Sequence, residues 1–249
     1  SYLILGASSG LGRELANILA ESSKDLIIIS RDERDLKTIK SDLETKFKVK
    51  VKYFVLDASA FDDVKNFLEL NLDLLEELEG IMFPIGMIEA NDNIINDIST
   101  SNSLIQANMG SISYFLSKVL PVFLKKNNGV IVGFGSVSSA IGREVNTIYA
   151  ASKRGLESLF ESLALTTASS KIKIQFYTIG YLDSNLAYGR KLLLPKGSVK
   201  KLAKKVRKNI KKNYKKIYYP SWWIVIVGII KILPFSFLRI IYKFLKNKN

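Results

Sequence analysis

A tyrosine, a lysine and a serine stand at spacings that suit proton transfer to or from a substrate oxygen. Tyr149 and Lys153 are four residues apart in Tyr-Ala-Ala-Ser-Lys, so on a helix they share one face. There the ammonium is expected to lower the pKa of the phenol, and a tyrosine so tuned exchanges a proton near neutral pH. Ser136 precedes the tyrosine by thirteen residues and can hold the same oxygen. The three residues predict carbonyl or alcohol oxidation–reduction, provided that the chain also binds a nicotinamide cofactor.

A glycine-rich turn near the start of the chain predicts a site for such a cofactor. The apolar run at residues 1–5 is typical of a buried strand, and apolar residues at helical spacing follow over residues 11–19. Between them, Gly6 permits a tight turn, Gly10 lets the backbone approach a pyrophosphate, and Gly12 lets the helix pack close to the strand. The helix N-terminus then faces the anion. The predicted cofactor contacts in this turn are Gly6, Ser8, Ser9, Gly10, Leu11 and Gly12.

The end of the second predicted strand bears on the choice of nicotinamide cofactor. A carboxylate there would bind the ribose 2′-hydroxyl of NAD, but this position holds Ser30, followed by Arg31. A guanidinium beside a hydroxyl suits a 2′-phosphate, which favours NADPH over NADH. In the alternative interpretation, Arg31 is a solvated loop charge that Asp32, Glu33 and Asp35 neutralise.

The motifs of residues 1–190, in this order and at these spacings, resemble those of the short-chain dehydrogenase/reductase family. The glycine-rich turn matches the cofactor turn of the family, and Ser136, Tyr149 and Lys153 match its catalytic serine, tyrosine and lysine. The resemblance implies direct hydride transfer from NADPH to a carbonyl carbon. It also implies that Tyr149 protonates the carbonyl oxygen, that Lys153 tunes the tyrosine and holds the nicotinamide ribose, and that Ser136 orients the carbonyl.

Further positions take their roles from the same resemblance. Asn108, in Gln-Ala-Asn-Met-Gly, matches the asparagine that holds a water for proton relay towards the lysine. Asp57 matches the aspartate that contacts adenine, and Gly180 and Ser184 match the segment that closes over the nicotinamide carboxamide. The remaining implied cofactor contacts are Ala58, Gly86, Tyr149 and Lys153.

Three positions depart from the family pattern. Leu5 replaces a threonine that often precedes the first glycine, and Ile179 replaces a proline before Gly180. Residues 83–86, Phe-Pro-Ile-Gly, replace the usual Asn-Asn-Ala-Gly. None of these changes removes a group that transfers protons. The third is expected to alter how the central sheet is braced or the shape of the site near the nicotinamide.

Strands and helices that alternate along the chain must position these residues. This alternation predicts an α/β fold with a doubly wound, Rossmann-like parallel sheet in a single domain, covered by helices on both faces. Ligands of such sheets bind at the carboxyl ends of the strands. The strand-like runs are 2–5, 26–29, 51–56, 80–83, 130–134 and 172–178, and the helical runs include 104–124 and 147–168.

The composition limits the remaining chemistry. The chain of 249 residues contains no Cys and no His, which excludes thiol chemistry, disulfides and histidine-based metal sites, so no metal is predicted. Its length suffices to bury a sizeable core. The absence of Cys fits a reducing cytoplasm. No signal peptide is predicted, because the chain opens directly in a strand, without a basic segment and a cleavage site.

The excess of positive charge lies entirely in the C-terminal part. Residues 190–249 hold 18 Lys and Arg and no carboxylate, whereas residues 1–189 hold 19 Lys and Arg against 23 Asp and Glu. Over residues 198–217, apolar residues at steps of three or four predict an amphipathic helix with a basic polar face. Residues 1–190 are therefore interpreted as an NADP-binding catalytic domain, and residues 191–249 as a basic amphipathic helix with a hydrophobic, membrane-associating tail.

The hydrophobic part of this tail suits a membrane interface better than a membrane crossing. Residues 218–238 approach the length of a spanning helix, but Lys231 and Pro234 interrupt them. Lys231, Arg239 and Lys243 share one side of an ideal helix, opposite Trp, Phe and Ile, which is typical of a helix lying on an anionic membrane. The alternatives are a spanning helix, packing on the domain, or a dimer interface. Nucleic acid is not predicted, because an apolar run accompanies the lysines.

The tail also resembles the endings of a subgroup of the family. Its Tyr-Pro-x-Trp, apolar stretch and Leu-Pro are similar to those of the reductase subunits of decaprenylphosphoryl-ribose epimerases. Those subunits reduce a keto-sugar on a polyprenyl phosphate after a partner flavoprotein has oxidised it. The resemblance implies a flavoprotein oxidase partner and a role in cell-envelope polysaccharide synthesis.

Three functional hypotheses follow. The leading one is an NADPH-dependent reductase of a lipid-linked keto-sugar or another lipid ketone, peripheral at the inner face of the membrane. The second is a reductase of free 3-ketolipids, such as 3-ketosphinganine or a 3-oxoacyl compound. The third is a non-catalytic NADP-binding interaction protein, which the presence of Asn108, Ser136, Tyr149 and Lys153 disfavours. The family is commonly dimeric or tetrameric, which implies a homo-oligomer.

Overall fold

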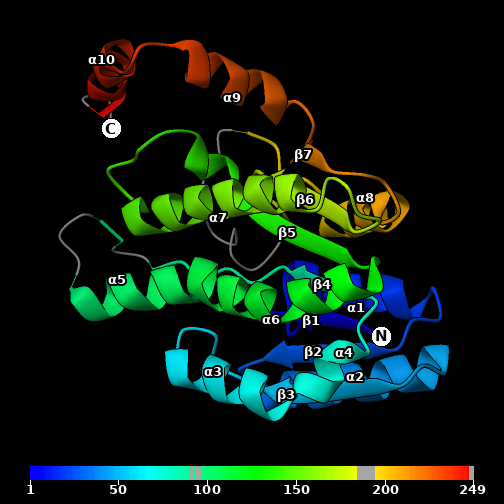
Figure 1. Cartoon of the computed structure of the whole chain (residues 1–249). Coiled ribbons are helices and arrows are strands. Elements are labelled where there is room, and N and C mark those ends of the chain that lie inside the picture. Colours follow the sequence, from blue (N-terminus) through cyan, green and yellow to red (C-terminus); the bar gives the residue numbers. More distant parts are fainter. Residues whose placement is uncertain (90–91, 94–96, 184–193, 247–249) are drawn as a thin grey trace.

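One parallel sheet organises the computed structural model, which describes residues 1–89, 92–93, 97–183 and 194–246 (Figure 1). Its strand order is β3-β2-β1-β4-β5-β6-β7, and every neighbouring pair is parallel. The predicted doubly wound sheet is confirmed. The strands are β1 (Tyr2–Leu5), β2 (Leu26–Ser30), β3 (Val51–Val55), β4 (Gly80–Phe83), β5 (Val130–Ser136), β6 (Lys173–Ile179) and β7 (Lys215–Tyr219).

Helices cover both faces of this sheet, and each layer has its own apolar core (Figure 1). Side chains alternate between the layers along a strand, so Ile4 joins the first core while Leu3 and Leu5 join the second. Because both faces are buried, the central strands are continuous apolar runs. The first layer contains α1 (Gly10–Ala20), α2 (Glu33–Phe47) and α8 (Val199–Asn209). The second contains α3 (Phe61–Leu70), α4 (Leu72–Glu76), α6 (Ser111–Lys126) and α7 (Thr147–Thr166).

The strand order reverses at β1, and this reversal places the functional site. β1 pairs with β2 on one side and with β4 on the other. The connections that leave these strands therefore run to opposite faces of the sheet, and they open a crevice at the carboxyl ends. The helical run predicted at 104–124 borders the crevice as α5 (Ile98–Ile105), the π-helical turn η1 (Gln106–Gly110) and α6.

The single amphipathic helix predicted over 198–217 is wrong in its second half. Helix α8 ends at Asn209, and the chain returns as β7, which pairs with β6. An open edge of β6 would leave unpaired backbone groups, and Ile217, Tyr218 and Tyr219 have the branched and aromatic side chains that strands favour. Pairing with the sheet therefore prevails over continuation of the helix.

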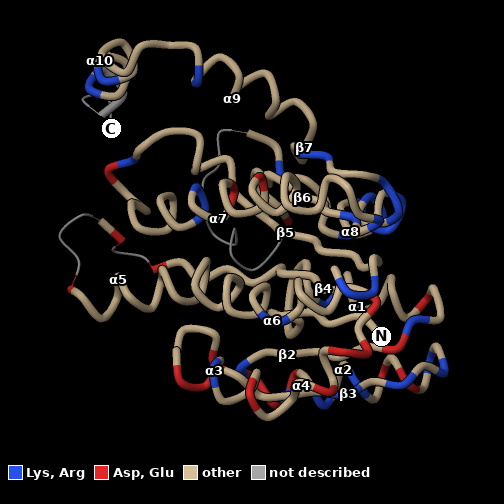
Figure 2. Tube along the Cα trace, viewed as in Figure 1, with Lys and Arg blue, Asp and Glu red and all other residues tan. Residues whose placement is uncertain are grey.

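The apolar face of α8 is also buried within the protein. Its side chains Val199, Leu202 and Val206 pack into the first core, where α8 lies against α1. Its lysines cover the outer face, where basic residues gather in Figure 2. The boundary predicted at residue 190 lies outside the described residues, so the division of the chain there stays a prediction.

Two helices complete the described part of the chain, α9 (Trp223–Ile232) and α10 (Phe235–Lys246). Among the described helices, none is by itself long and apolar enough to cross a membrane. Helix α9 and residues Phe235–Lys243 reach that length and composition only as a pair, with a bend of 112° between them.

Candidate active site

A cavity of about 510 Å³ lies at the carboxyl ends of strands β1 to β6. Loops after all six strands supply its lining, as the parallel sheet requires. Among the predicted site residues, Gly12 and Asn108 stand behind the lining, and Ser184 lies outside the described residues. The predicted residues that line the cavity are Gly6, Ser8, Ser9, Gly10, Leu11, Ser30, Arg31, Asp57, Ala58, Gly86, Ser136, Tyr149, Lys153 and Gly180.

The glycine-rich turn has the close approaches that its sequence predicts. Gly6 has φ +97°, and a Cβ there would lie 2.9 Å from the backbone of Ile85. A Cβ on Gly12 would lie 1.9 Å from the carbonyl oxygen of Gly6, so only glycine lets α1 pack this close to β1. The Ser9 hydroxyl makes no capping hydrogen bond, and the first turn of α1 holds no carboxylate. The N-terminus of α1 is therefore suited to an anion.

Arg31 lies at the rim of the cavity and makes no ion pair within the described part of the chain. Asp32 instead caps α2 by accepting from the backbone N–H of Asp35 at 3.0 Å. Glu33 and Asp35 pair with other cations of α2. The hydroxyl of Ser30, which is buried, accepts from the backbone N–H of Asp32 at 3.2 Å. The arrangement leaves the guanidinium available for an anionic ligand.

Asp57 and Ala58 form the wall of the cavity beyond β3. The Asp57 carboxylate accepts hydrogen bonds from the backbone N–H of Ser59 at 2.9 Å and from its hydroxyl at 2.7 Å. These bonds fix the carboxylate in a turn, where it lines the part of the cavity nearest β3.

Ser136 and Tyr149 meet on the opposite side of the cavity. Ser136 ends β5 and precedes the 3₁₀ turn η2 (Val137–Ala140), while Tyr149 belongs to the first turn of α7. The Ser136 hydroxyl is near enough to the Tyr149 phenol to act against the rise of its pKa. The hydroxyl of Ser138 also donates to the Ser136 Oγ at 2.8 Å. The predicted serine and tyrosine thus lie close together.

Lys153 lies one turn beyond the tyrosine on the same helix. Its side chain is buried, and Nζ donates to the carbonyl oxygens of Ile85 at 3.0 Å and Phe134 at 3.2 Å. The Ile85 carbonyl lies just after β4, and the Phe134 carbonyl belongs to β5. The ammonium therefore bridges the carboxyl ends of these two strands. The replacement of the usual motif by residues 83–86 leaves this bridge intact, because the backbone supplies the acceptor.

The pKa values in the cavity differ from the sequence-based prediction in one respect. Burial raises the pKa of Tyr149, although the nearby Ser136 hydroxyl opposes the shift. Burial also lowers the pKa of Lys153 to about 8. The ammonium of Lys153 was predicted to lower the pKa of the tyrosine, but it is directed at two carbonyls. Desolvation therefore dominates the pKa values of both groups.

Asn108 braces the loop after β4 from the π-helical turn η1. Its Oδ1 accepts from the backbone N–H of Met87 and its Nδ2 donates to the carbonyl of Met87, both at 2.9 Å. A Cβ on Gly86 would lie 3.8 Å from Lys153 Nζ and 3.9 Å from Asn108 Oδ1, so these three residues adjoin. Widened helical turns of this kind occur often at functional sites. The water-holding role of Asn108 stays a prediction.

Asp92 is a site residue that the motifs did not predict. Its carboxylate is buried and accepts from the backbone N–H groups of Ile148 at 2.9 Å and Tyr149 at 2.8 Å. It therefore caps α7 from a distant loop and fixes the start of the helix that carries the tyrosine. A single aspartate 57 residues before Tyr149 gives no local signal of this contact, which only the tertiary structure reveals.

Gly180 borders the cavity and is covered from outside by α9. A Cβ on Gly180 would lie 1.8 Å from Nε1 of Trp223, so the indole packs directly on this backbone. The ring of the adjacent Tyr181 meets the Trp223 ring edge-to-face, with centroids 6.0 Å apart. The segment predicted to close over the nicotinamide is thus in contact with the C-terminal helix.

Comparison with known proteins places this site in a family. The family model described as short chain dehydrogenase matches residues 1–191. The 3-oxoacyl-[acyl-carrier-protein] reductase of Buchnera aphidicola subsp. Schizaphis graminum is 29% identical over 208 residues, which cover 80% of each protein. The NADP-dependent 3-hydroxy acid dehydrogenase of Schizosaccharomyces pombe is 26% identical over 192 residues, which cover 76% of this chain and 74% of that protein.

A solved structure has the same fold. The short-chain dehydrogenase from Sphingobium yanoikuyae, in complex with NADPH, superposes with a TM-score of 0.79 at 22% identity and covers 92% of each chain. The family match spans the sheet, the glycine-rich turn and the helix that bears Tyr149 and Lys153. The chain therefore belongs to the short-chain dehydrogenase/reductase family, whose members use NAD(P) and act on alcohols and ketones.

Proposed function

We propose that this protein reduces a ketone with NADPH, and that the ketone is a lipid-linked keto-sugar or another lipid ketone at a membrane surface. The observation that carries the proposal is the convergence of Ser136, Tyr149 and Lys153 on the same cavity as the glycine-rich turn and Arg31. A proton donor and an anion-binding turn in one cavity are the two parts that such a reductase needs.

The residues of the cavity fit a dinucleotide with a 2′-phosphate. The N-terminus of α1 and the backbone at Gly6 suit a pyrophosphate, because no side chain or carboxylate obstructs them. Arg31 would hold the 2′-phosphate, with Ser30 beside it. An NADP-dependent relative and a structural neighbour in complex with NADPH support this choice of cofactor.

The bound cofactor supplies the hydride, and the side chains of this protein handle the proton. The Tyr149 hydroxyl would donate its proton to the carbonyl oxygen, which becomes the alcohol. The Ser136 hydroxyl, which lines the same cavity, would hold the same oxygen. The Lys153 ammonium would stabilise the tyrosinate that remains, and Asn108 keeps the adjoining loop in place.

The C-terminal helices support a lipid setting for this reaction. They expose apolar side chains that include Ile232 (84% exposed), Phe235 (64%) and Ile240 (64%). Lys231 and Arg239 accompany them, and Figure 2 shows basic residues on α10 beside long uncharged stretches. A large exposed apolar surface next to cations suits anionic lipid. The proposed location is the cytoplasmic face of a membrane, with α9 and α10 on its surface.

A second candidate is a reductase of free 3-ketolipids, which is favoured by the relative named as a 3-oxoacyl-[acyl-carrier-protein] reductase. The test is NADPH consumption by the full chain with three substrates: a polyprenyl-phosphate-linked keto-sugar, 3-ketosphinganine and a 3-oxoacyl thioester. Turnover of the keto-sugar in preference to both ketolipids supports the first candidate, and turnover of one or both ketolipids in preference to the keto-sugar supports the second. Failure with all three, although NADPH binds, would overturn both candidates.

A further inference from the structure

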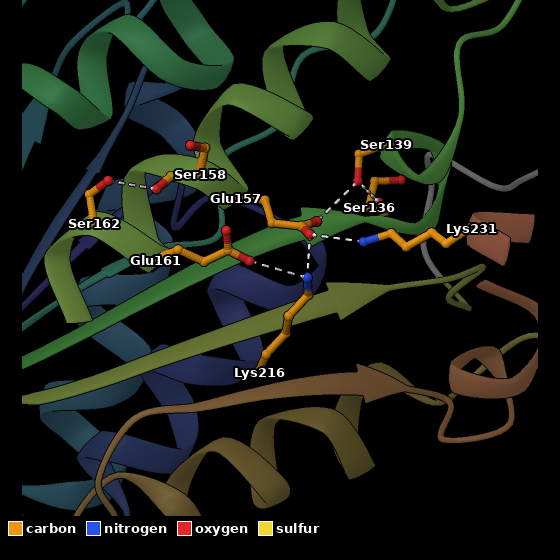
Figure 3. Close-up of polar contacts among 8 residues, drawn as sticks. All are labelled: Ser136, Ser139, Glu157, Ser158, Glu161, Ser162, Lys216 and Lys231. Atoms are coloured by element: carbon orange, nitrogen blue, oxygen red, sulfur yellow. Dashed lines mark hydrogen bonds and ion pairs between the residues drawn. The ribbon is translucent and has the colours of Figure 1, made fainter. Parts of the chain in front are cut away.

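A cluster of charged side chains joins helix α9 and strand β7 to α7, the helix that carries Tyr149 and Lys153 (Figure 3). At its centre, the carboxylate of Glu157 on α7 contacts the ammonium of Lys216 on β7 and lies 3.6 Å from that of Lys231 on α9. The Glu157 side chain is only 13% exposed, and that of Lys216 is 21% exposed. This cluster is the point where α7, β7 and α9 are tied together by charge.

Glu157 occupies the face of α7 that carries the proposed catalytic pair. Tyr149, Lys153 and Glu157 are spaced four residues apart, so they follow one another along a single side of the helix. Glu161, one turn further on, contacts only Lys216, at 3.5 Å, and its side chain is 52% exposed. The two carboxylates therefore differ in burial and in their contact with α9.

The same carboxylate reaches the turn that follows Ser136. The Ser139 hydroxyl donates to the Ser136 carbonyl at 2.6 Å, and its oxygen lies 3.4 Å from Oε2 of Glu157 (Figure 3). The short bond holds η2 tightly to the end of β5. The longer contact, between Ser139 and Glu157, joins η2 to the charged cluster on α7.

Helix α9 packs on the other side of η2. Trp223 and Val227, the buried residues of α9, form a small apolar cluster with Ala140 of η2. Val137, which packs against that cluster, also lines the substrate cavity. The serine turn is thus held between α7 and α9, and the ion pair of Glu157 with Lys231 spans these two helices.

We propose that Glu157 is a positioning residue: its carboxylate seats α9 against α7 and thereby fixes the turn that presents Ser136 to the ketone. The proposal rests on the proposed role of Ser136, and it explains why a largely buried carboxylate holds two lysines from separate elements. These contacts hold the turn after Ser136 and do not touch the glycine-rich turn or Arg31, while α9 also packs on Gly180. The KM for the ketone should therefore depend on Glu157 more strongly than the dissociation constant for NADPH does.

The two tryptophans of the chain give a direct readout, because Trp222 and Trp223 both lie where α9 begins and their rings stack at 4.7 Å. In Glu157→Gln we expect stronger quenching of tryptophan fluorescence by acrylamide. We also expect a KM for the ketone raised on the order of tenfold, with a smaller rise in the dissociation constant for NADPH. Lys231→Gln should show the same pattern, and the double variant should be no worse than Glu157→Gln alone, because the shared contact is already lost.

Glu161→Gln is the matched control, since it makes the same chemical change one turn away, and it should behave as the wild type. Wild-type quenching and KM in both Glu157→Gln and Lys231→Gln would overturn the proposal. If Glu157→Gln raised the dissociation constant for NADPH as much as the KM for the ketone, the proposal would also be overturned, because Glu157 would then support the fold in general. If the wild type reduces no ketone, the proposed function fails, while the fluorescence of the variants still decides whether Glu157 seats α9.

Discussion

Lys153 combines burial with two hydrogen bonds to backbone carbonyls, at 3.0 Å to Ile85 and 3.2 Å to Phe134. The ammonium form donates more strongly to both acceptors than a neutral amine does, yet burial brings the pKa of Lys153 down to about 8. The bridge across the crevice is therefore charged at neutral pH and loses its proton in mildly alkaline solution.

This titration predicts the pH dependence of the reaction. Because the pKa is lowered, the active ammonium is present below about 8 and disappears as the pH rises through that value. The pKa of Tyr149 is raised, so the proton donor stays protonated over the same interval. We expect kcat/KM for ketone reduction to fall above pH 8, as the free enzyme titrates. A kcat/KM that is constant from neutral to strongly alkaline pH would contradict this assignment.

Arg31 is expected to determine the preference for NADPH over NADH. Its guanidinium is free of carboxylates within the described chain, so Arg31→Gln should lower the preference for NADPH over NADH on the order of tenfold to a hundredfold. The measurement is the ratio of kcat/KM for the two cofactors. Arg34→Gln provides the control, because Arg34 is exposed and pairs with Asp35 at 3.7 Å. Equal ratios in wild type and Arg31→Gln would refute the role.

At the scale of elements, the β1–α1 unit depends on the absence of side chains at its glycines. A Cβ on Gly12 would stand 1.9 Å from the Gly6 carbonyl oxygen, which is backbone and cannot move aside easily. We expect Gly12→Ala to lower the free energy of unfolding by about 3 kcal/mol or to displace α1, and to abolish NADPH binding. Gly142→Ala is the matched control, since a Cβ there meets nothing within 4 Å. Normal NADPH binding and stability in Gly12→Ala would show that the turn is looser than described.

The elements also show what the sequence could and could not predict. Buried strands such as β1 and β4 and the glycine-rich turn carry local signals, and their predicted positions agree with the structure. Strand β7 carries no such local signal, because its apolar residues fit a helical spacing. Only pairing with the open edge of β6 makes this segment a strand. Asp92 likewise acts through a contact with α7 that is distant in sequence.

At the scale of the whole molecule, the exposed apolar side chains of α9 and α10 predict binding to anionic vesicles. Changing Ile232, Phe235 and Ile240 together to glutamate should remove co-sedimentation of the full chain with such vesicles while leaving NADPH binding intact. The control is the same triple change in exposed apolar residues on other helices, at Leu70, Ile98 and Leu165. This control should still sediment.

The result that contradicts the membrane proposal is a wild-type chain that stays in solution with anionic vesicles. The apolar surface would then suit contact with another protein chain, and the size of the particle in solution would show whether that chain is a second copy.

The most direct test of the central claim is the rate of ketone reduction by Tyr149→Phe. This change removes one hydroxyl from a tyrosine whose ring and helix stay in place, held by Asp92 at the start of α7. We expect kcat to fall by a factor of about 10² to 10⁴, the usual contribution of a general acid, with NADPH affinity unchanged. Retention of the wild-type kcat in Tyr149→Phe would show that the proton comes from another group and would contradict the proposed mechanism.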